Sequence, residues 1–146
     1  MQKKDDKYVL SAGDINGFLN CKRLTELDTQ VANGNLAKPE FNDPHLKVMQ
    51  ERGFEHERNY IDFLKDKGLN FESAESSDRE DAYQKTIDLM KKGVDIIAQG
   101  VLRLQGWYGR SDILLKVNLP SSLGNYSYIV LDTKLSRETK AGSIMQ

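Results

Sequence analysis

The sequence predicts an α/β (α+β) protein in which helices pack on a small sheet that begins with a three-stranded antiparallel meander. Two observations carry this prediction. Apolar residues recur at helical spacing over residues 11–30, 44–67 and 81–92, whereas residues 94–135 contain three strand-like runs. The connections between those runs are short, and strands joined in this way pair antiparallel.

Length and composition indicate one polar globular domain, residues 1–146, with 38% hydrophobic and 29% charged residues. The net charge of −1 counts against a protein that holds nucleic acid by electrostatics alone. No apolar run approaches the ~20 residues that span a bilayer. The charged start, residues 1–6, is followed by no signal-peptide core, and we expect it to be frayed. We therefore expect a cytoplasmic protein with no membrane partner.

The first two helices have clear boundary signals. Ser11 or Asp14 can cap the first helix, which Asn33-Gly34-Asn35 ends. The second helix has Asp43 as its N-cap and Pro44 at its first position, and Gly68 stops it. Its apolar stripe is formed by Leu46, Met49, Gly53, Phe54, Tyr60, Ile61 and Leu64.

Two polar residues interrupt this stripe. Glu57 falls near its centre and His56 lies on its flank. A carboxylate in the middle of a buried stripe is costly without a partner. Either these side chains form hydrogen bonds within the fold, or they face a metal site; the periodicity favours Glu57 as the buried one.

The second half of the chain begins with a polar connector, residues 71–79, and a third helix, 81–92, closed by Gly93. Strand-like runs follow over residues 94–102, 107–117 and 126–135. Two aromatic residues open the middle run and could stack on bases of a single strand, although such residues more often belong to the core: Trp107 and Tyr108.

Acidic residues lie on the second and third of these strands. Asp112 ends Gly109-Arg110-Ser111-Asp112, and Asp132-Thr133-Lys134 follows an apolar run. Because strand side chains alternate, Arg110, Asp112 and Leu114 should share one face, and Val130, Asp132 and Lys134 another. If the faces coincide, two carboxylates converge as ligands for a hard divalent cation, beside an ammonium that could orient a water. The alternative is a solvated Asp–Lys pair at a strand end.

These features resemble the PD-(D/E)XK nuclease superfamily, and within it the RecB-like nuclease group. The resemblance covers roughly residues 8–146. Its best-matching segments are Phe18-Leu19-Asn20-Cys21, Arg52-Gly53-Phe54-Glu55-His56-Glu57, Gln99-Gly100-Val101-Leu102, Gly109-Arg110-Ser111-Asp112 and Leu131-Asp132-Thr133-Lys134-Leu135. It implies a restriction-endonuclease-like core and a Mg²⁺- or Mn²⁺-dependent hydrolase of phosphodiester bonds.

The resemblance also implies site residues. Asp112 and Asp132 would ligate the metal, and the carbonyl of Thr133 would complete its coordination sphere. Lys134 would be the catalytic lysine. The family motif assigns a further metal ligand to His56, with Glu57 as the rival. Two additional site residues are possible under this resemblance. Arg110 would contact phosphate, or it is a plain surface residue. Gln146 stands where relatives carry a glutamine after the strand that holds the catalytic lysine.

By this resemblance the substrate is DNA rather than RNA, and the enzyme is exonuclease-like, in DNA repair, processing or defence. The alternative is a nuclease-derived binding or assembly module that does not cleave. The closing helix and strand of the family fold are missing before residue 146, which predicts a C-terminally incomplete domain with a downstream domain or self-association. Some relatives hold an iron–sulfur cluster, but Cys21 alone cannot anchor one, and we expect it to be buried and inert.

Overall fold

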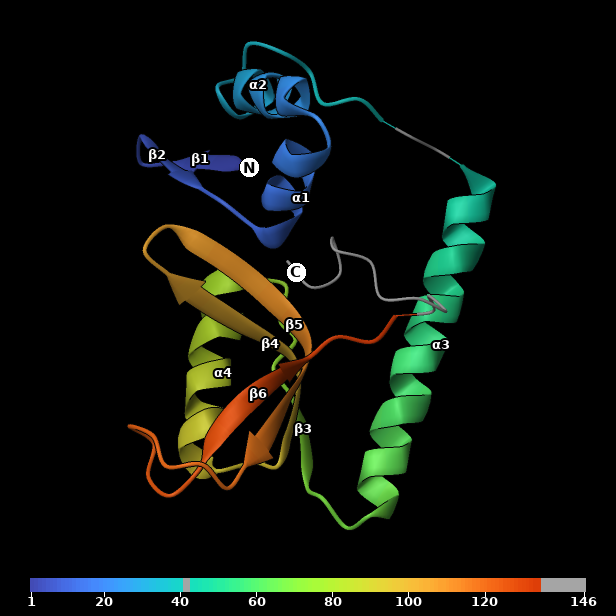
Figure 1. Ribbon diagram of the computed structural model, residues 1–146, viewed down its shortest axis with the longest axis vertical. Helices are drawn as coiled ribbons and strands as arrows, with labels where there is room; N and C mark the ends of the chain where they lie inside the picture. Colours follow the sequence, from blue (N-terminus) through green and yellow to red (C-terminus); the bar gives the residue numbers. More distant parts are fainter. Residues whose placement is uncertain (41–42, 135–146) are drawn as a thin grey trace. The chain divides into compact units, whose positions relative to one another are not determined.

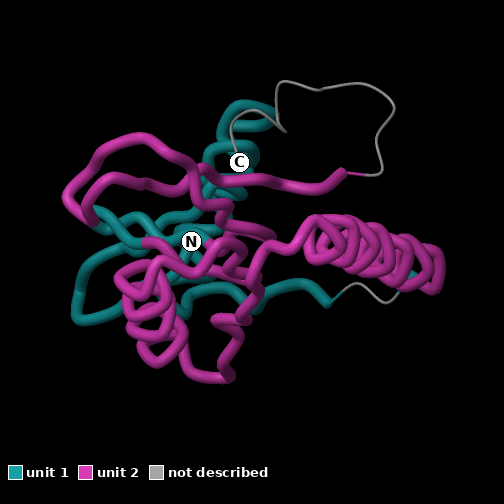
Figure 2. The backbone as a smooth tube through the Cα atoms, turned by 90° about the horizontal axis from the view of Figure 1, so that it is seen from below, with its two compact units in different colours: residues 1–43, 103–109, 136–146 teal, residues 44–102, 110–135 magenta. Residues whose placement is uncertain are grey.

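The structure is a computed structural model that describes residues 1–40 and 43–134 (Figure 1). Its described part is a mixed α/β protein with four helices, a two-stranded sheet and a four-stranded sheet. The chain divides into two compact units (Figure 2): residues 1–43, 103–109 and 136–146, and residues 44–102 and 110–135. Within the described residues, no helix is both long and apolar enough to cross a membrane.

The first unit begins with a hairpin where we expected a frayed terminus, and that prediction is wrong. Strand β1, Gln2–Lys4, pairs antiparallel with β2, Lys7–Val9. Asp5 and Asp6 form the turn with φ of 49° and 59°. Aspartate tolerates positive φ better than most residues, and such φ values match the twist of a two-residue hairpin.

A bend at Cys21 divides the expected helix 11–30 into α1, Ala12–Asn20, and α2, Lys22–Ala32. Cys21 is extended, with φ −159° and ψ 106°. Its N–H donates to the Gly17 carbonyl and its own carbonyl accepts from Leu24 N–H, so one residue caps both helices. Cys21 is exposed at this corner, and the prediction that it is buried is wrong.

The second unit is built from a mixed sheet and two helices. The sheet order is β3-β4-β5-β6, where β3 pairs parallel with β4 and β5 pairs antiparallel with β6. The two residues Gln105-Gly106 join β4 to β5, a connection that only antiparallel neighbours allow. The bounds are α3 Pro44–Asp66, β3 Phe71–Ser73, α4 Arg79–Lys92, β4 Ile96–Leu104, β5 Trp107–Val117 and β6 Ser127–Leu131.

Strand β3 lies inside the segment that we expected to be a polar connector. Three residues are too few to show an alternation of apolar and polar side chains, so the sequence gives no strand signal there. The pairing of Phe71 with Ile96 makes β3–α4–β4 a parallel crossover unit. Helix α4 ends where expected, because Gly93 closes it at φ 73°, but it begins at Arg79 and not at the expected residue 81, because Asp78 caps its first turn.

Each face of the sheet is covered by one helix. On the α3 face the buried residues are Ile61, Leu64, Ile96, Ala98 and Ile113. On the α4 face they are Ala74, Leu89, Val94, Ile97 and Leu114. Consecutive residues of β4 and β5 thus alternate between the two clusters, as strand geometry requires.

Only the C-terminal half of α3 contributes to the core. Ile61 and Leu64 are buried, whereas Leu46, Met49 and Phe54 are 52%, 62% and 58% exposed. The expectation that the whole stripe is buried is therefore wrong. Periodicity identifies the apolar side of a helix, but it does not tell how far along the helix the sheet extends.

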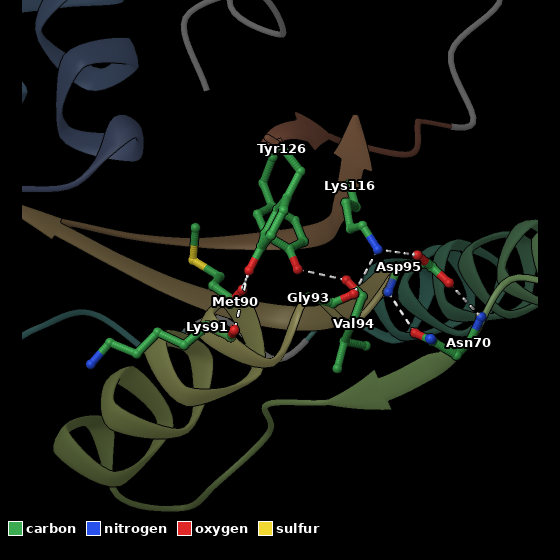
Figure 3. Close-up of polar contacts among 9 residues, drawn as sticks. Asn70, Met90, Lys91, Gly93, Val94, Asp95, Lys116 and Tyr126 are labelled. Carbon is green, nitrogen blue, oxygen red and sulfur yellow. Dashed lines mark hydrogen bonds and ion pairs between the residues drawn. The ribbon is translucent and has the colours of Figure 1, made fainter. Parts of the chain in front are cut away.

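A polar network closes the end of the sheet next to the C-terminus of α4 (Figure 3). Lys116 Nζ donates to the Gly93 carbonyl and to Asp95 Oδ1, both at 2.8 Å. Asn70 exchanges two hydrogen bonds with Asp95, donating its N–H and accepting that of Asp95. Tyr126 and Tyr128 donate to main-chain carbonyls of residues 90, 91 and 94. These contacts fix β5 and β6 to the loop that follows α4.

Candidate active site

The carboxyl groups of Asp112 and Asp132 meet at one edge of the sheet. In the antiparallel pair of β5 and β6, Ile113 lies opposite Leu131, so the next pair along the register is residue 112 opposite residue 132. A hydrogen bond with Asp132 and the charge of Asp132 both raise the pKa of Asp112, as expected for two neighbouring carboxyl groups. The register therefore brings together the two acids that the sequence places on neighbouring strands.

Thr133 and Lys134 complete this group of residues. Thr133 donates to Asp112 Oδ2 with its main-chain N–H at 2.9 Å and with its hydroxyl at 3.3 Å. Lys134 Nζ lies 2.9 Å from Asp132 Oδ1 and 2.8 Å from Oδ2. The Asp132 and Lys134 side chains are 29% and 43% exposed, so this ion pair is accessible to water.

Glu57 and His56 are neighbours on helix α3, and they differ in burial. The negative charge of Glu57 acts on Asp112, and its side chain is half-buried, whereas His56 is exposed. Neighbouring residues of a helix differ in direction by about 100°, so the two cannot face one point together. Of the two residues that the sequence left as alternatives, Glu57 is the one whose charge acts on Asp112.

Glu57 is held by a residue of β4. Gln99 Nε2 donates to Glu57 Oε1 at 2.8 Å. No role for Gln99 was predicted from the sequence, although Gln99 lies in one of the segments that resemble the nuclease superfamily. No sequence signal reveals this contact, because it joins residues 42 positions apart on a helix and a strand.

The remaining predicted residues lie elsewhere. Arg110 is exposed on β5, and Gln146 lies outside the described residues. Leu114 belongs to the cluster on the α4 face and Ile113 to the cluster on the α3 face, an alternation that is consistent with Asp112 and Leu114 sharing a face of β5. Trp107 is 40% exposed in the first unit and is not a core residue.

The electrostatics of the site favour positive charge. Burial raises the pKa of Asp112 above its ordinary value of 3.8, and so do the hydrogen bond and the charge of Asp132 and the charge of Glu57. The Thr133 N–H acts in the opposite direction, because it stabilises the ionised form. The net shift is upward, so Asp112 binds a proton more readily than an isolated aspartate does. The negative charges of Asp132 and Glu57, unlike burial, would also attract a metal cation.

The chemistry of these side chains matches what a hard divalent cation prefers, since all three acids offer oxygen. Across residues 1–40 and 43–134, no group of three or more His, Cys, Asp or Glu side chains is arranged to hold a metal ion. Mg²⁺ does not require such a group. It keeps several waters and is usually bound through one or two carboxylates together with substrate phosphates. The Asp112–Asp132 pair fits that mode of binding.

Comparisons with protein-family models, with curated proteins and with solved structures found no match to this chain.

Proposed function

We propose that this protein is a Mg²⁺- or Mn²⁺-dependent deoxyribonuclease with a restriction-endonuclease-like core, and that the Asp112–Asp132 pair is its metal site. The observation that supports the proposal most is the convergence of four neighbouring groups. These are the two carboxyls, the Thr133 main chain and the Lys134 ammonium, all at the point where the chain leaves β6. A solvated ion pair at a strand end would not need a second, half-buried acid beside it.

Asp112 and Asp132 would hold the ion, with the Thr133 carbonyl as a further oxygen ligand, and the negative charge of Glu57 would add to the attraction of a cation. When bound, such an ion lowers the pKa of a coordinated water and offsets charge on a phosphate. Thr133 N–H keeps Asp112 Oδ2 in place and favours its ionised form. Asp132 must be free to leave Lys134 in order to bind a cation, and its exposure permits this exchange.

Lys134 would act on the substrate once it is released from Asp132. Its three N–H donors can orient the attacking water and can also contact a scissile phosphate oxygen. Arg110, exposed on β5, can contact phosphate with its planar guanidinium. The net charge of −1 agrees with a site whose affinity for nucleic acid depends on the metal rather than on a basic surface.

The proposal is tested by cleavage of labelled DNA in the presence of Mg²⁺ or Mn²⁺. Asp112→Ala, Asp132→Ala and Lys134→Ala should each abolish turnover while the circular dichroism spectrum stays native. The matched controls Asp62→Ala and Lys65→Ala remove an exposed ion pair of 3.3 Å on α3 and should leave the rate unchanged. Retained activity in the Asp132→Ala protein would refute the mechanism.

A further inference from the structure

Strand β6 is an outer strand of the four-stranded sheet, and its own sequence does not protect its open edge. Among the described strands it pairs with β5 alone. Natural proteins protect such edges with charged residues, with proline or by making the strand very short. The other outer strand, β3, has only three residues, of which Glu72 is charged. Strand β6 has five residues, Ser127–Leu131, and none is charged or proline, so its main-chain groups can pair with a further strand.

Both apolar clusters of the sheet extend to β6 and are incompletely covered there. Ile129 lies opposite Leu115 on the α3 face, and Val130 lies opposite Leu114 on the α4 face. Ile129 is 41% exposed and Val130 is 53% exposed. A helix packed on one face could cover only one of these two side chains, because consecutive strand residues point to opposite faces. A strand added along the edge would cover both.

Strand β6 of a second copy is complementary to this edge. In an antiparallel pair about a two-fold axis at Ile129, each Ile129 lies opposite its counterpart, and each Tyr128 lies opposite Val130 of the other copy. Apolar pairs and aromatic–β-branched pairs of this kind stabilise a sheet. Because β6 contains no charged residue, the pairing places no like charges opposite each other. The net charge of −1 per chain also causes little repulsion between two copies.

We propose that β6 is a homodimer interface, at which the β6 strands of two copies pair antiparallel and join their four-stranded sheets into one continuous sheet. The partner is a second copy of this chain, recognised through main-chain hydrogen bonds and through the apolar side chains of residues 128–130. The inference is independent of the proposed function, because it uses none of the carboxyl groups of the candidate active site.

The test is sedimentation velocity of the whole chain over a range of concentrations. The unmodified protein should convert from monomer to dimer as its concentration rises. Ile129→Lys places two like charges opposite each other at the two-fold axis, so the dissociation constant of the dimer should rise at least about ten-fold. Leu104→Lys is the matched control, since it adds the same charge at a residue of β4 that is 70% exposed and should leave the dissociation constant unchanged.

A mixture of two variants tests whether the partner is a second copy. Ile129→Lys and Ile129→Glu should each be monomeric alone, and an equimolar mixture should form the dimer, because opposite charges then meet at the axis. In the unmodified protein, the amide hydrogens of β6 should exchange more slowly at dimeric than at monomeric concentrations. If Ile129→Lys does not fold, Val130→Lys at the more exposed neighbouring position replaces it.

Three results would overturn the inference. The first is an unmodified protein that stays monomeric at every concentration, including one that dimerises only after residues 135–146 are deleted. The second is a dimer that Ile129→Lys and Leu104→Lys weaken equally. The third is a dimer whose β6 amides exchange as fast as those of the monomer.

Discussion

The main-chain N–H of Thr133 donates a 2.9 Å hydrogen bond to Oδ2 of Asp112, and this bond ties the end of β6 to the acid on β5. The bond depends on the register that places Ile113 opposite Leu131. A shift by one residue would turn the side chains of one strand to the other face and separate the two acids. Strand register is therefore what assembles the candidate site.

Asp112→Asn should stabilise the protein at neutral pH. The pKa of Asp112 is raised by burial and by its acidic neighbours, so the folded state binds a proton more tightly than the unfolded state. Stability then falls as pH rises from the ordinary value of 3.8 through the raised pKa, and the ionised group is unfavourable above it. The gain should be a fraction of a kcal/mol, because water screens a half-exposed carboxyl. Urea unfolding at pH 7 and at pH 3 measures it; at pH 3 the difference should vanish.

Asp95→Asn should change stability in the opposite direction to Asp112→Asn. The hydrogen bond from Lys116 holds the pKa of Asp95 below its ordinary value of 3.8. The ionised Asp95 therefore stabilises the fold at pH values above 3.8. It is lost as pH falls through the lowered pKa. The variant should be less stable at pH 7, and the deficit should shrink on acidification in the same unfolding series. If Asp112→Asn and Asp95→Asn change stability at pH 7 in the same direction, the raised pKa of Asp112 and the lowered pKa of Asp95 are contradicted.

Gly100→Ala should destabilise the fold by about 1–3 kcal/mol through overpacking. A Cβ at this position would lie 2.6 Å from Leu114 Cδ1 and 3.1 Å from its Cγ, and Leu114 is 1% exposed in the core. Thermal unfolding measures the loss. Gly53→Ala is the control, because a Cβ there meets no described atom within 4 Å and alanine favours a helix. A neutral Gly100→Ala would show that the packing around Gly100 is looser than described.

Lys116→Met should cost about 1–2 kcal/mol, because it removes two hydrogen bonds of a charged group at the end of the sheet. Arg23→Met removes an ion pair whose side chains are 72% and 63% exposed, and it should change stability by less than about 0.5 kcal/mol. Denaturant unfolding of both variants checks the contrast. Similar effects would mean that the network in Figure 3 contributes no more than a surface pair.

Lys134→Ala should separate metal binding from cleavage. The ammonium contacts both oxygens of Asp132, so it competes with a cation for that carboxylate. Its removal should leave Mn²⁺ affinity equal or higher while DNA cleavage is lost. Calorimetry and a cleavage assay on one preparation make the comparison. Weaker Mn²⁺ binding in this variant would contradict a competing role.

Much of the second unit could be predicted from local signals. The strand-like runs and their short connections predicted β4, β5 and β6 in the correct order, and with them the positions of Asp112 and Asp132. Helix periodicity placed Glu57 on the apolar side of α3, which is the side that faces the sheet. Each of these signals arises from residues close together in sequence, so the sequence alone was enough to predict these elements.

The missed features depend on contacts between distant residues or on unusual backbone. Strand β3 exists through its parallel pairing with β4, which no three-residue pattern reveals. Cys21 breaks a helix whose apolar spacing continues on both sides of it. Gln99 has a positive φ that glutamine rarely adopts, so the sequence does not show that its side chain reaches Glu57.

The most direct test of the central claim is the rate at which the protein hydrolyses end-labelled DNA, with Mg²⁺ and with excess chelator, compared with Asp132→Asn. We expect cleavage that requires the metal and falls at least about 100-fold in the variant, because the variant loses a ligand charge at the metal site. Asp62→Asn, on the exposed side of α3, should cleave at the unmodified rate. Metal-independent cleavage, an active Asp132→Asn protein, or DNA binding with no cleavage under any divalent metal would contradict the account.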